Sequence, residues 1–248
     1  MAAMRYLRTV AAAALAALAM AAAADEGAMR ETLQRVFPQA SVQGIASTPI
    51  AGLYEAAIDG QVYYVSEDGR YILGGPLIDA KNRVNLTEAR LESINAIPWN
   101  SLPLDLAIKR TKGAGTRSIA IFEDPDCPYC KTLEQTLSGI DDLAVYVLLY
   151  PIDDLHPQAA EKSRAVWCAK DRAKAWDEIM RTGVPPSNAG ACDAPLAKIA
   201  DFAKRHRITG TPTIVLTDGR RLVGARSRAE LEKQTLRAAK PWAGGDRS

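Results

Sequence analysis

The sequence predicts two folded parts: a small α+β domain over residues 25–85 and an α/β domain over residues 115–248. Two observations indicate this division. Short segments rich in β-formers, separated by glycine-containing turns, fill the first part. Longer apolar strands alternate with helical patterns in the second part, as in a sheet covered by helices. Residues 86–114 begin with a helical pattern that Pro98 and Pro103 interrupt, and we expect them to form a linker helix and connection.

Residues 1–24 have the pattern of a secretory signal peptide. Two arginines precede an apolar run at 10–23, which is almost pure alanine and leucine, and small residues end at Ala24. A membrane anchor is the alternative, but a spanning helix needs roughly 20 apolar residues and this run is shorter. The mature chain is therefore expected to begin at Asp25 and to be soluble and exported.

Composition and charge favour an ordinary globular protein. The 248 residues are 48% hydrophobic and 24% charged, and the formal net charge is only +2. No basic tract is present, so we expect no nucleic-acid partner. The four cysteines, an even number, suit an oxidising compartment.

The first domain is predicted to be a helix and a small antiparallel sheet. Apolar residues at helical spacing over 29–37 end at Pro38, and Asp59-Gly60 is a favoured two-residue hairpin turn. It contains no cysteine or histidine, and its tyrosines are expected to serve packing. The edge segment beside Gly74 is predicted to pair with a second copy. The expected strands are Val42–Ser47, Leu53–Ile58, Gln61–Ser66, Arg70–Leu73 and Leu77–Asp79.

The second domain opens with the motif that carries the chemistry. Cys127 and Cys130 lie between a predicted strand, Ser118–Phe122, and a helix that begins at Pro128. Cys127 is thus the N-cap residue, where unpaired N–H groups and the helix dipole favour the reactive thiolate. Cys130 lies one turn along, where it can attack a mixed disulfide formed by Cys127. A Cys-x-x-Cys motif within a βαβ pattern is typical of thioredoxin-like redox proteins.

Two alternatives stay open for this motif: half of a zinc site, or an inert structural pair. A zinc site would be supported by a second such motif or by histidines at ligand spacing. The only histidines, His156 and His206, are far apart in the sequence. We therefore predict no metal and no cofactor.

The rest of the domain follows a thioredoxin order with a helical insertion. An almost unbroken apolar run is typical of a central strand covered on both faces. The expected elements are a strand at Leu143–Tyr150, one long helix at Gln158–Met180, a helix at Pro195–Arg205, strands at Thr211–Leu216 and Arg221–Gly224, and a closing helix at Arg228–Ala238.

Four stretches together resemble the DsbC/DsbG family of periplasmic disulfide isomerases, over essentially the whole mature chain. The Pro-Tyr pair between Cys127 and Cys130 resembles DsbG, whereas the second cysteine pair resembles DsbC, to which the chain is closer overall. The stretches are Phe122–Lys131, Val166–Asp171 with Cys192-Asp193, Gly210–Thr213, and Tyr71–Pro76.

The resemblance implies the architecture and the partners. Residues 25–85 would be a cystatin-like dimerisation domain, and residues 115–248 the thioredoxin-like catalytic domain of a V-shaped homodimer with an apolar cleft. Misfolded, disulfide-containing exported proteins would be the substrates, in the periplasm, with chaperone activity in the cleft. A DsbD-like membrane thiol reductase would keep the active cysteines reduced.

The resemblance also implies residue roles. Cys127 would attack and Cys130 would release trapped substrate. Thr211 and Pro212, joined by a cis bond, would bind substrate together with Pro128 and Tyr129; an ordinary trans proline is the alternative. Cys168 and Cys192 would form a structural disulfide in a buried setting, with two free buried thiols as the alternative.

One departure and three alternatives remain. Many thioredoxin-like proteins have a buried acid six residues before the first cysteine, where this chain has Ile121, so the proton acceptor for Cys130 is open. The charges of Glu123, Asp124 and Asp126 are expected to oppose a low pKa at Cys127. The alternatives are a DsbG-like reductase that protects single cysteines from over-oxidation, a protein that is mainly a holdase chaperone, and a plain oxidase.

Overall fold

The structure, a computed structural model, describes residues 26–239, so the predicted signal peptide lies outside the described residues. The chain divides into two units, one ending at Ile94 and the other beginning at Asn95. Among the described residues, no helix combines the length and the apolar character needed to cross a membrane. Both units mix helices and strands, which confirms the predicted fold class.

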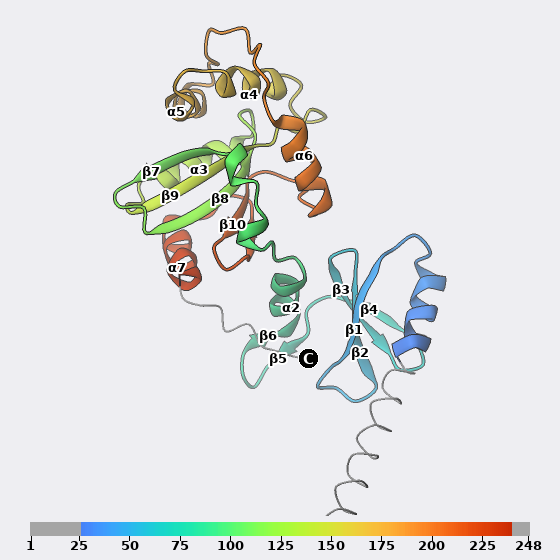
Figure 1. Cartoon of the computed structure of the whole chain (residues 1–248). Coiled ribbons are helices and arrows are strands. Elements are labelled where there is room, and N and C mark those ends of the chain that lie inside the picture. The colour runs from blue at the N-terminus through green and yellow to red at the C-terminus, as the bar shows by residue number, and fades with distance from the viewer. Residues whose placement is uncertain (1–25, 240–248) are drawn as a thin grey trace, which may run out of the picture. The chain divides into compact units, whose positions relative to one another are not determined.

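Unit 1 is a four-stranded antiparallel sheet with a helix over residues 26–36 (Figure 1). The core between them contains Leu33, Ala56 and Val65, all with no exposed surface. The strands run in the order β1 (Val42–Ser47), β2 (Leu53–Ile58), β3 (Gln61–Ser66), β4 (Ile72–Gly74). A short ribbon, β5 (Ile78–Asp79) with β6 (Val84–Asn85), leads into α2 (Leu86–Ile94).

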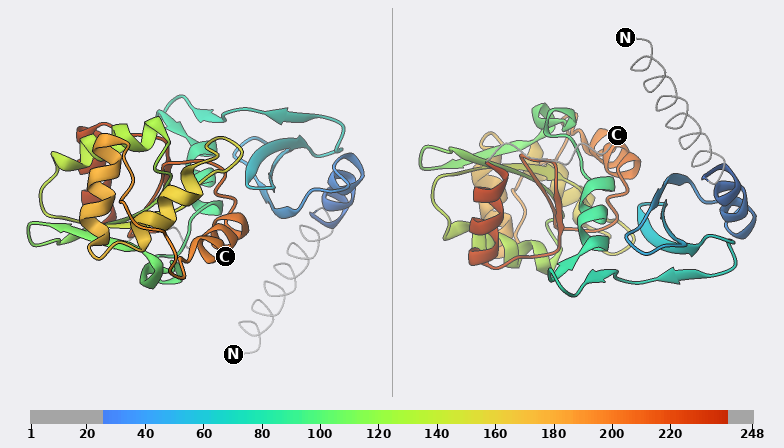
Figure 2. Two further views of the ribbon diagram at one scale, coloured as in Figure 1. Left: turned by 90° about the horizontal axis from the view of Figure 1, so that it is seen from above. Right: turned by 90° about the horizontal axis from the view of Figure 1, so that it is seen from below.

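Unit 2 contains a five-stranded sheet in the order β11-β10-β8-β9-β7, with helices on both faces (Figures 1 and 2). The central strands β8 and β9 are parallel and the other pairs are antiparallel. The strands are β7 (Ile108–Lys112), β8 (Arg117–Glu123), β9 (Leu143–Leu149), β10 (Thr213–Leu216) and β11 (Arg221–Val223), and the helices are α3 (Pro128–Ser138), α4 (Ala159–Trp167), α5 (Arg172–Thr182), α6 (Leu196–Arg205) and α7 (Arg228–Ala238).

Alternation along β8 divides the core of unit 2 into two layers. Ile119 and Ile121 face the layer that contains residues of α3, α4, α5 and α7, whereas Ala120 and Phe122 face the layer of α6. Cys127 and Cys130 belong to the first layer. The alternation therefore directs every second side chain of β8 toward the Cys-x-x-Cys helix.

The expectation that residues 86–114 only connect the domains is wrong in one part. Ile108–Lys112 is strand β7, which pairs with β9 along its whole length at the edge of the sheet. Only Ile108 in this strand is buried, so the segment lacks the apolar run that marks a central strand. Residues from Asn95 onward also belong to unit 2, and α2 belongs to unit 1.

The single long helix predicted over 158–180 is also wrong. It is two helices, α4 and α5, separated by a break at 168–171. Asp171 is the N-cap of α5, and its carboxylate accepts a hydrogen bond from the Lys174 backbone N–H at 3.0 Å. An aspartate N-cap favours a new helix start over continuation, and the apolar spacing alone hid it.

Candidate active site

Cys127 occupies the N-cap of α3, with Pro128 at the first helical position. Its Sγ lies 3.4 Å from the Thr211 carbonyl oxygen. Cys127 is 5% exposed and Cys130 is fully buried, and the two thiols are free rather than joined. One sulfur can therefore be reached at the rim of the domain while the other lies behind it.

The surroundings lower the pKa of Cys127 and raise that of Cys130. The pKa of Cys127 is lowered to about 5, and the largest cause is the hydrogen bond that the Cys130 thiol donates to the Cys127 sulfur. Burial acts in the opposite direction. Hydrogen bonds with Thr211 and with the backbone N–H groups of Cys130 and Tyr129 lower this pKa further. Burial raises the pKa of Cys130, and its hydrogen bond with Cys127 and the charge of Glu123 raise it further. At neutral pH the pair therefore holds one thiolate and one thiol.

The loop opposite the cysteines contains the cis peptide bond between Thr211 and Pro212, as the sequence predicts. The Pro212 carbonyl accepts a hydrogen bond from the Gly224 backbone N–H at 2.8 Å, which fixes the loop against the end of β11. Tyr129, between the two cysteines, is 65% exposed. The structure thus brings together Cys127, Cys130 and Thr211, with Tyr129 at the surface beside them.

Asp124 is a structural anchor that sequence reasoning did not identify as such. Its buried carboxylate accepts hydrogen bonds from the backbone N–H of Asp126 at 2.8 Å, from that of Ile152 at 2.8 Å, and lies 3.0 Å from His156 Nδ1. These bonds tie the loop before Cys127 to the segment after β9. An acid two residues before a turn was the signal in the sequence, but its distant partners were not visible there.

Glu123, Asp124 and Asp126 were expected to oppose a low pKa at Cys127, and their effect on this pKa is small. Asp124 is fully hydrogen-bonded, and Asp126 forms a 2.6 Å ion pair with Lys162. Burial raises the pKa of Glu123 well above its usual value, and Glu123 is not among the largest causes that shift the pKa of Cys127. The N–H groups at the start of α3 and the hydrogen bond from Cys130 therefore have the larger effect on the pKa of Cys127.

A second polar cluster, partly buried, lies on the α3 side of β8. Glu134, one turn after Cys130, accepts two hydrogen bonds from the Arg110 guanidinium, at 2.6 and 2.7 Å, and one from the Trp176 indole at 3.0 Å. Arg110 also pairs with Asp177. The neighbouring Glu123 is fully buried, at the end of β8.

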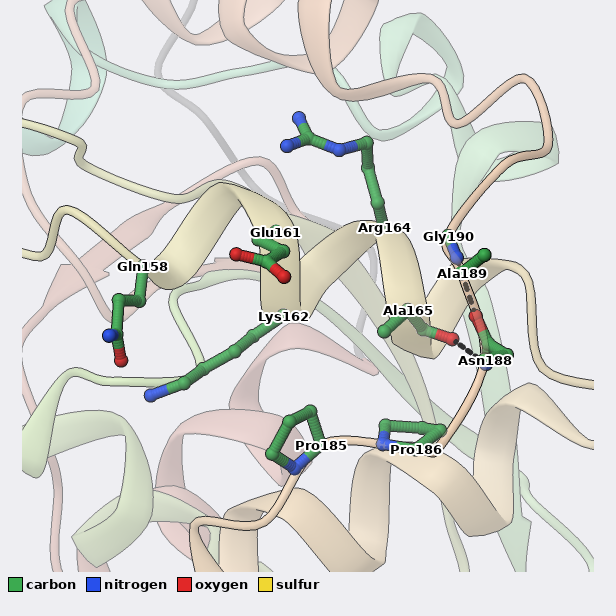
Figure 3. Close-up of a pocket in the computed structure, with 10 residues that line it drawn as sticks. All are labelled: Gln158, Glu161, Lys162, Arg164, Ala165, Pro185, Pro186, Asn188, Ala189 and Gly190. Atoms are coloured by element: carbon green, nitrogen blue, oxygen red, sulfur yellow. Dashed lines mark hydrogen bonds between the residues drawn. The ribbon is translucent and has the colours of Figure 1, made fainter.

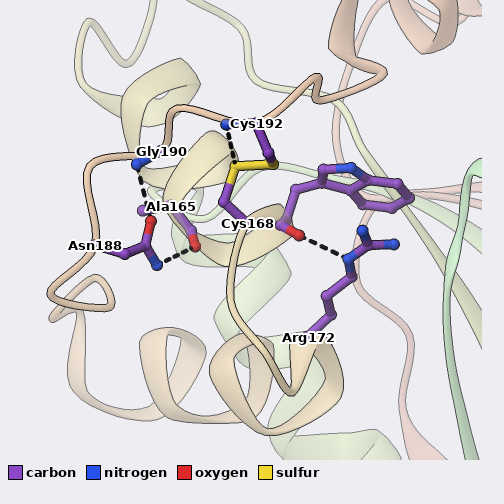
Figure 4. Close-up of a disulfide and its surroundings, with 7 residues drawn as sticks. Ala165, Cys168, Arg172, Asn188, Gly190 and Cys192 are labelled. Atoms are coloured by element: carbon purple, nitrogen blue, oxygen red, sulfur yellow. Dashed lines mark hydrogen bonds between the residues drawn. A yellow bond between two sulfur atoms is a disulfide. The ribbon is translucent and has the colours of Figure 1, made fainter.

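The second cysteine pair forms a disulfide between Cys168 and Cys192 (Figure 4). It joins the end of α4 to the 183–195 loop, which is also held by the Asn188 amide donating to the Ala165 carbonyl at 2.8 Å. The expected buried setting is wrong, because Cys192 is exposed and Cys168 only partly buried. The apolar residues around Cys168 face the core through α4, whereas the loop that supplies Cys192 lies at the surface.

A pocket of about 270 Å³ lies between α4 and the same loop (Figure 3). Lys162 lines it and also pairs with Asp126, next to Cys127, so the pocket adjoins the active-site loop. Its lining combines charged and polar side chains with alanine, proline and glycine residues, and includes no thiol or imidazole. Across residues 26–239, no three His, Cys, Asp or Glu side chains are grouped so that they could hold a metal ion.

Comparisons with known proteins cover both units. Residues 20–88 match the disulfide bond isomerase protein N-terminal domain, and residues 104–239 match a thioredoxin-like domain. The chain is 41% identical to a probable thiol:disulfide interchange protein DsbC of Bordetella parapertussis, over 83% of this chain and 72% of the relative.

Two further relatives agree. The chain is 28% identical to the thiol:disulfide interchange protein DsbC of Escherichia coli, over 88% of this chain and 91% of the relative. The crystal structure of a disulfide interchange protein from Neisseria gonorrhoeae is similar with a TM-score of 0.54 and 39% identity, over 56% of this chain and 100% of that one.

Proposed function

Because the chain belongs to the DsbC family of thiol:disulfide interchange proteins, we propose that it rearranges non-native disulfides in exported proteins through Cys127. The observation that carries the proposal is the position of the Cys127 sulfur, at a helix N-cap beside the Thr211 carbonyl, where its pKa is lowered to about 5. An isomerase needs a thiolate that attacks readily and also leaves readily.

The reaction follows from the two different cysteines. The Cys127 thiolate attacks one sulfur of a substrate disulfide; a bond forms between Cys127 and that sulfur, and the other substrate sulfur leaves as a thiolate. That thiolate attacks another substrate disulfide, and a substrate thiolate finally displaces Cys127. When the complex stalls, the Cys130 thiolate attacks Cys127, an intramolecular disulfide forms, and the reduced substrate leaves.

The remaining predicted site residues serve substrate binding. The Thr211 carbonyl lies beside Cys127, and Pro212 follows through the cis bond; the backbone of this loop offers hydrogen-bonding groups to an extended peptide. Pro128 is exposed and Tyr129 presents a largely exposed aromatic ring next to the reactive sulfur. The Cys168–Cys192 disulfide holds the surface loop and takes no part in exchange.

The assembly and the compartment are part of the same proposal. We infer a homodimer through β4, which lies at the edge of its sheet; Leu73 in this strand is 55% exposed, and Tyr71 just before it is 60% exposed. The protein acts in the periplasm, holds unfolded substrates as a chaperone, and receives electrons from a membrane thiol reductase. Sedimentation of the mature protein at twice the monomer mass is the expected result, and a monomer would contradict the dimer.

The direct test uses a protein with scrambled disulfides in a glutathione buffer. Recovery of substrate activity is expected with the wild-type chain and not with Cys127→Ser. Insulin reduction without recovery would instead support the reductase that protects single cysteines. Suppression of aggregation by a Cys127→Ser/Cys130→Ser variant, with no effect of the wild-type chain on disulfide repair, would support the holdase.

A further inference from the structure

Glu123 is a buried acid that the reaction described above does not use. Its side chain has no exposed surface, and neither carboxyl oxygen accepts a hydrogen bond from a donor among the residues that the structure describes. A buried polar group without a partner costs free energy, which is tolerated in native structures mainly where the group has a function.

The fold places Glu123 on the same side of β8 as Cys130. Glu123 follows Ile121 by two residues on β8, so its side chain is directed to the face covered by α3. The backbone N–H of the next residue, Asp124, donates a hydrogen bond to the Cys130 sulfur. Glu134, one helical turn after Cys130, is close enough for its carboxyl to raise the pKa of Glu123.

We propose that Glu123 is the proton acceptor for Cys130 in the step that releases a mixed disulfide. The inference rests on the proposed function. In this step the Cys130 S–H proton passes to the Glu123 carboxylate, and the Cys130 thiolate attacks the Cys127 sulfur. The Cys127–Cys130 bond forms, the bond from Cys127 to the substrate breaks, and the substrate sulfur leaves as a thiolate that takes a proton from water.

The charged neighbours make this acceptor responsive to the state of Cys127. Burial raises the pKa of Glu123, and the Glu134 carboxyl raises it further; Arg110 opposes this, and the Cys127 thiolate adds to it. Formation of the mixed disulfide removes the Cys127 charge, which lowers the pKa of Glu123 when an acceptor is needed.

The test separates the two steps with a small disulfide. Reduced full-length mature protein is mixed rapidly with oxidised glutathione, quenched with acid and analysed by mass spectrometry. The first rate constant reports formation of the glutathione adduct at Cys127, and the second reports its resolution by Cys130. Glu123→Gln is expected to slow resolution about 100-fold at pH 7, the range of general base catalysis, while adduct formation changes less than about twofold. The deficit should narrow as pH rises, because hydroxide then removes the proton.

Two further variants keep the test decisive. Glu178→Gln, on the exposed face of α5, should match wild type. Glu134→Gln removes the neighbouring charge and should move the resolution profile to lower pH, and this measurement stands even where Glu123→Gln folds poorly. An unchanged resolution rate in Glu123→Gln, or a deficit that is equal at every pH, would overturn the proposal. Glu123-dependent resolution in a chain that repairs no scrambled protein would support this inference and overturn only the proposed function.

Discussion

The titration of Cys127 provides a quantitative test of the site. With a pKa of about 5, Cys127 is a thiolate in about 99% of molecules at pH 7, whereas a cysteine at the usual value of 9.0 would be one in about 1%. Alkylation by iodoacetamide, which requires the thiolate, should therefore be governed by a midpoint near pH 5. The rate is measured on the reduced protein from pH 3 to 9, with Cys127→Ser as the blank, because the buried Cys130 stays protonated throughout this range.

The perturbation is Cys130→Ala, which deletes the largest cause of the low pKa. The midpoint should rise toward 9, while the backbone N–H groups at the start of α3 keep it below the value of a free cysteine. The Tyr129→Ala variant keeps the Cys130 thiol and every backbone donor, so its midpoint should stay near 5. A wild-type midpoint above about 8, or one that Cys130→Ala leaves in place, would refute the reasoning.

Three other predictions concern stability. Replacing Cys168 and Cys192 with alanine opens a loop of 25 residues (a sequence separation of 24) and should cost about 3.5 kcal/mol in urea unfolding; a loss below about 1 kcal/mol would contradict the cross-link argument. Phe122→Ala, at a fully buried ring stacked on Phe202, should cost about 3–5 kcal/mol by the same measurement. The folded-state pKa of Cys127 lies below its unfolded value, so the stability of the reduced protein relative to the oxidised protein should rise as pH rises from about 5 to 9. This extra stability should be lost as pH falls through 5. The measurement is a parallel set of thermal melts of the two forms, and an equal pH dependence of their melting temperatures would show that the pKa of Cys127 is ordinary.

Local signals explain what could be predicted from the sequence. The junction of β8 and α3 was recognisable because an apolar strand, a cap residue and a proline occur within a few residues. The turn at Asp59-Gly60 and the closing helix α7 were equally local, and the structure has both where the patterns indicate them.

Features that depend on distant partners could not be predicted in the same way. Strand β7 is mostly exposed, so its pairing with β9 left no apolar run to detect. Asp124 was recognised only as a nearby charge, since Ile152 and His156 approach it through the fold. Glu123 shows the same limit: its alternation with Ile121 was visible, but its burial against Glu134 was not.

The position of β7 at the edge of its sheet has a consequence for aggregation. An edge strand presents unpaired N–H and C=O groups on which an extended polypeptide can add as a further strand and initiate co-aggregation. Lys109 and Lys112 are exposed on this strand, and Arg110 is engaged with acids of α3 and α5. An incoming strand would have to strip water from these lysines, so the outer edge of this sheet resists the addition of a further strand.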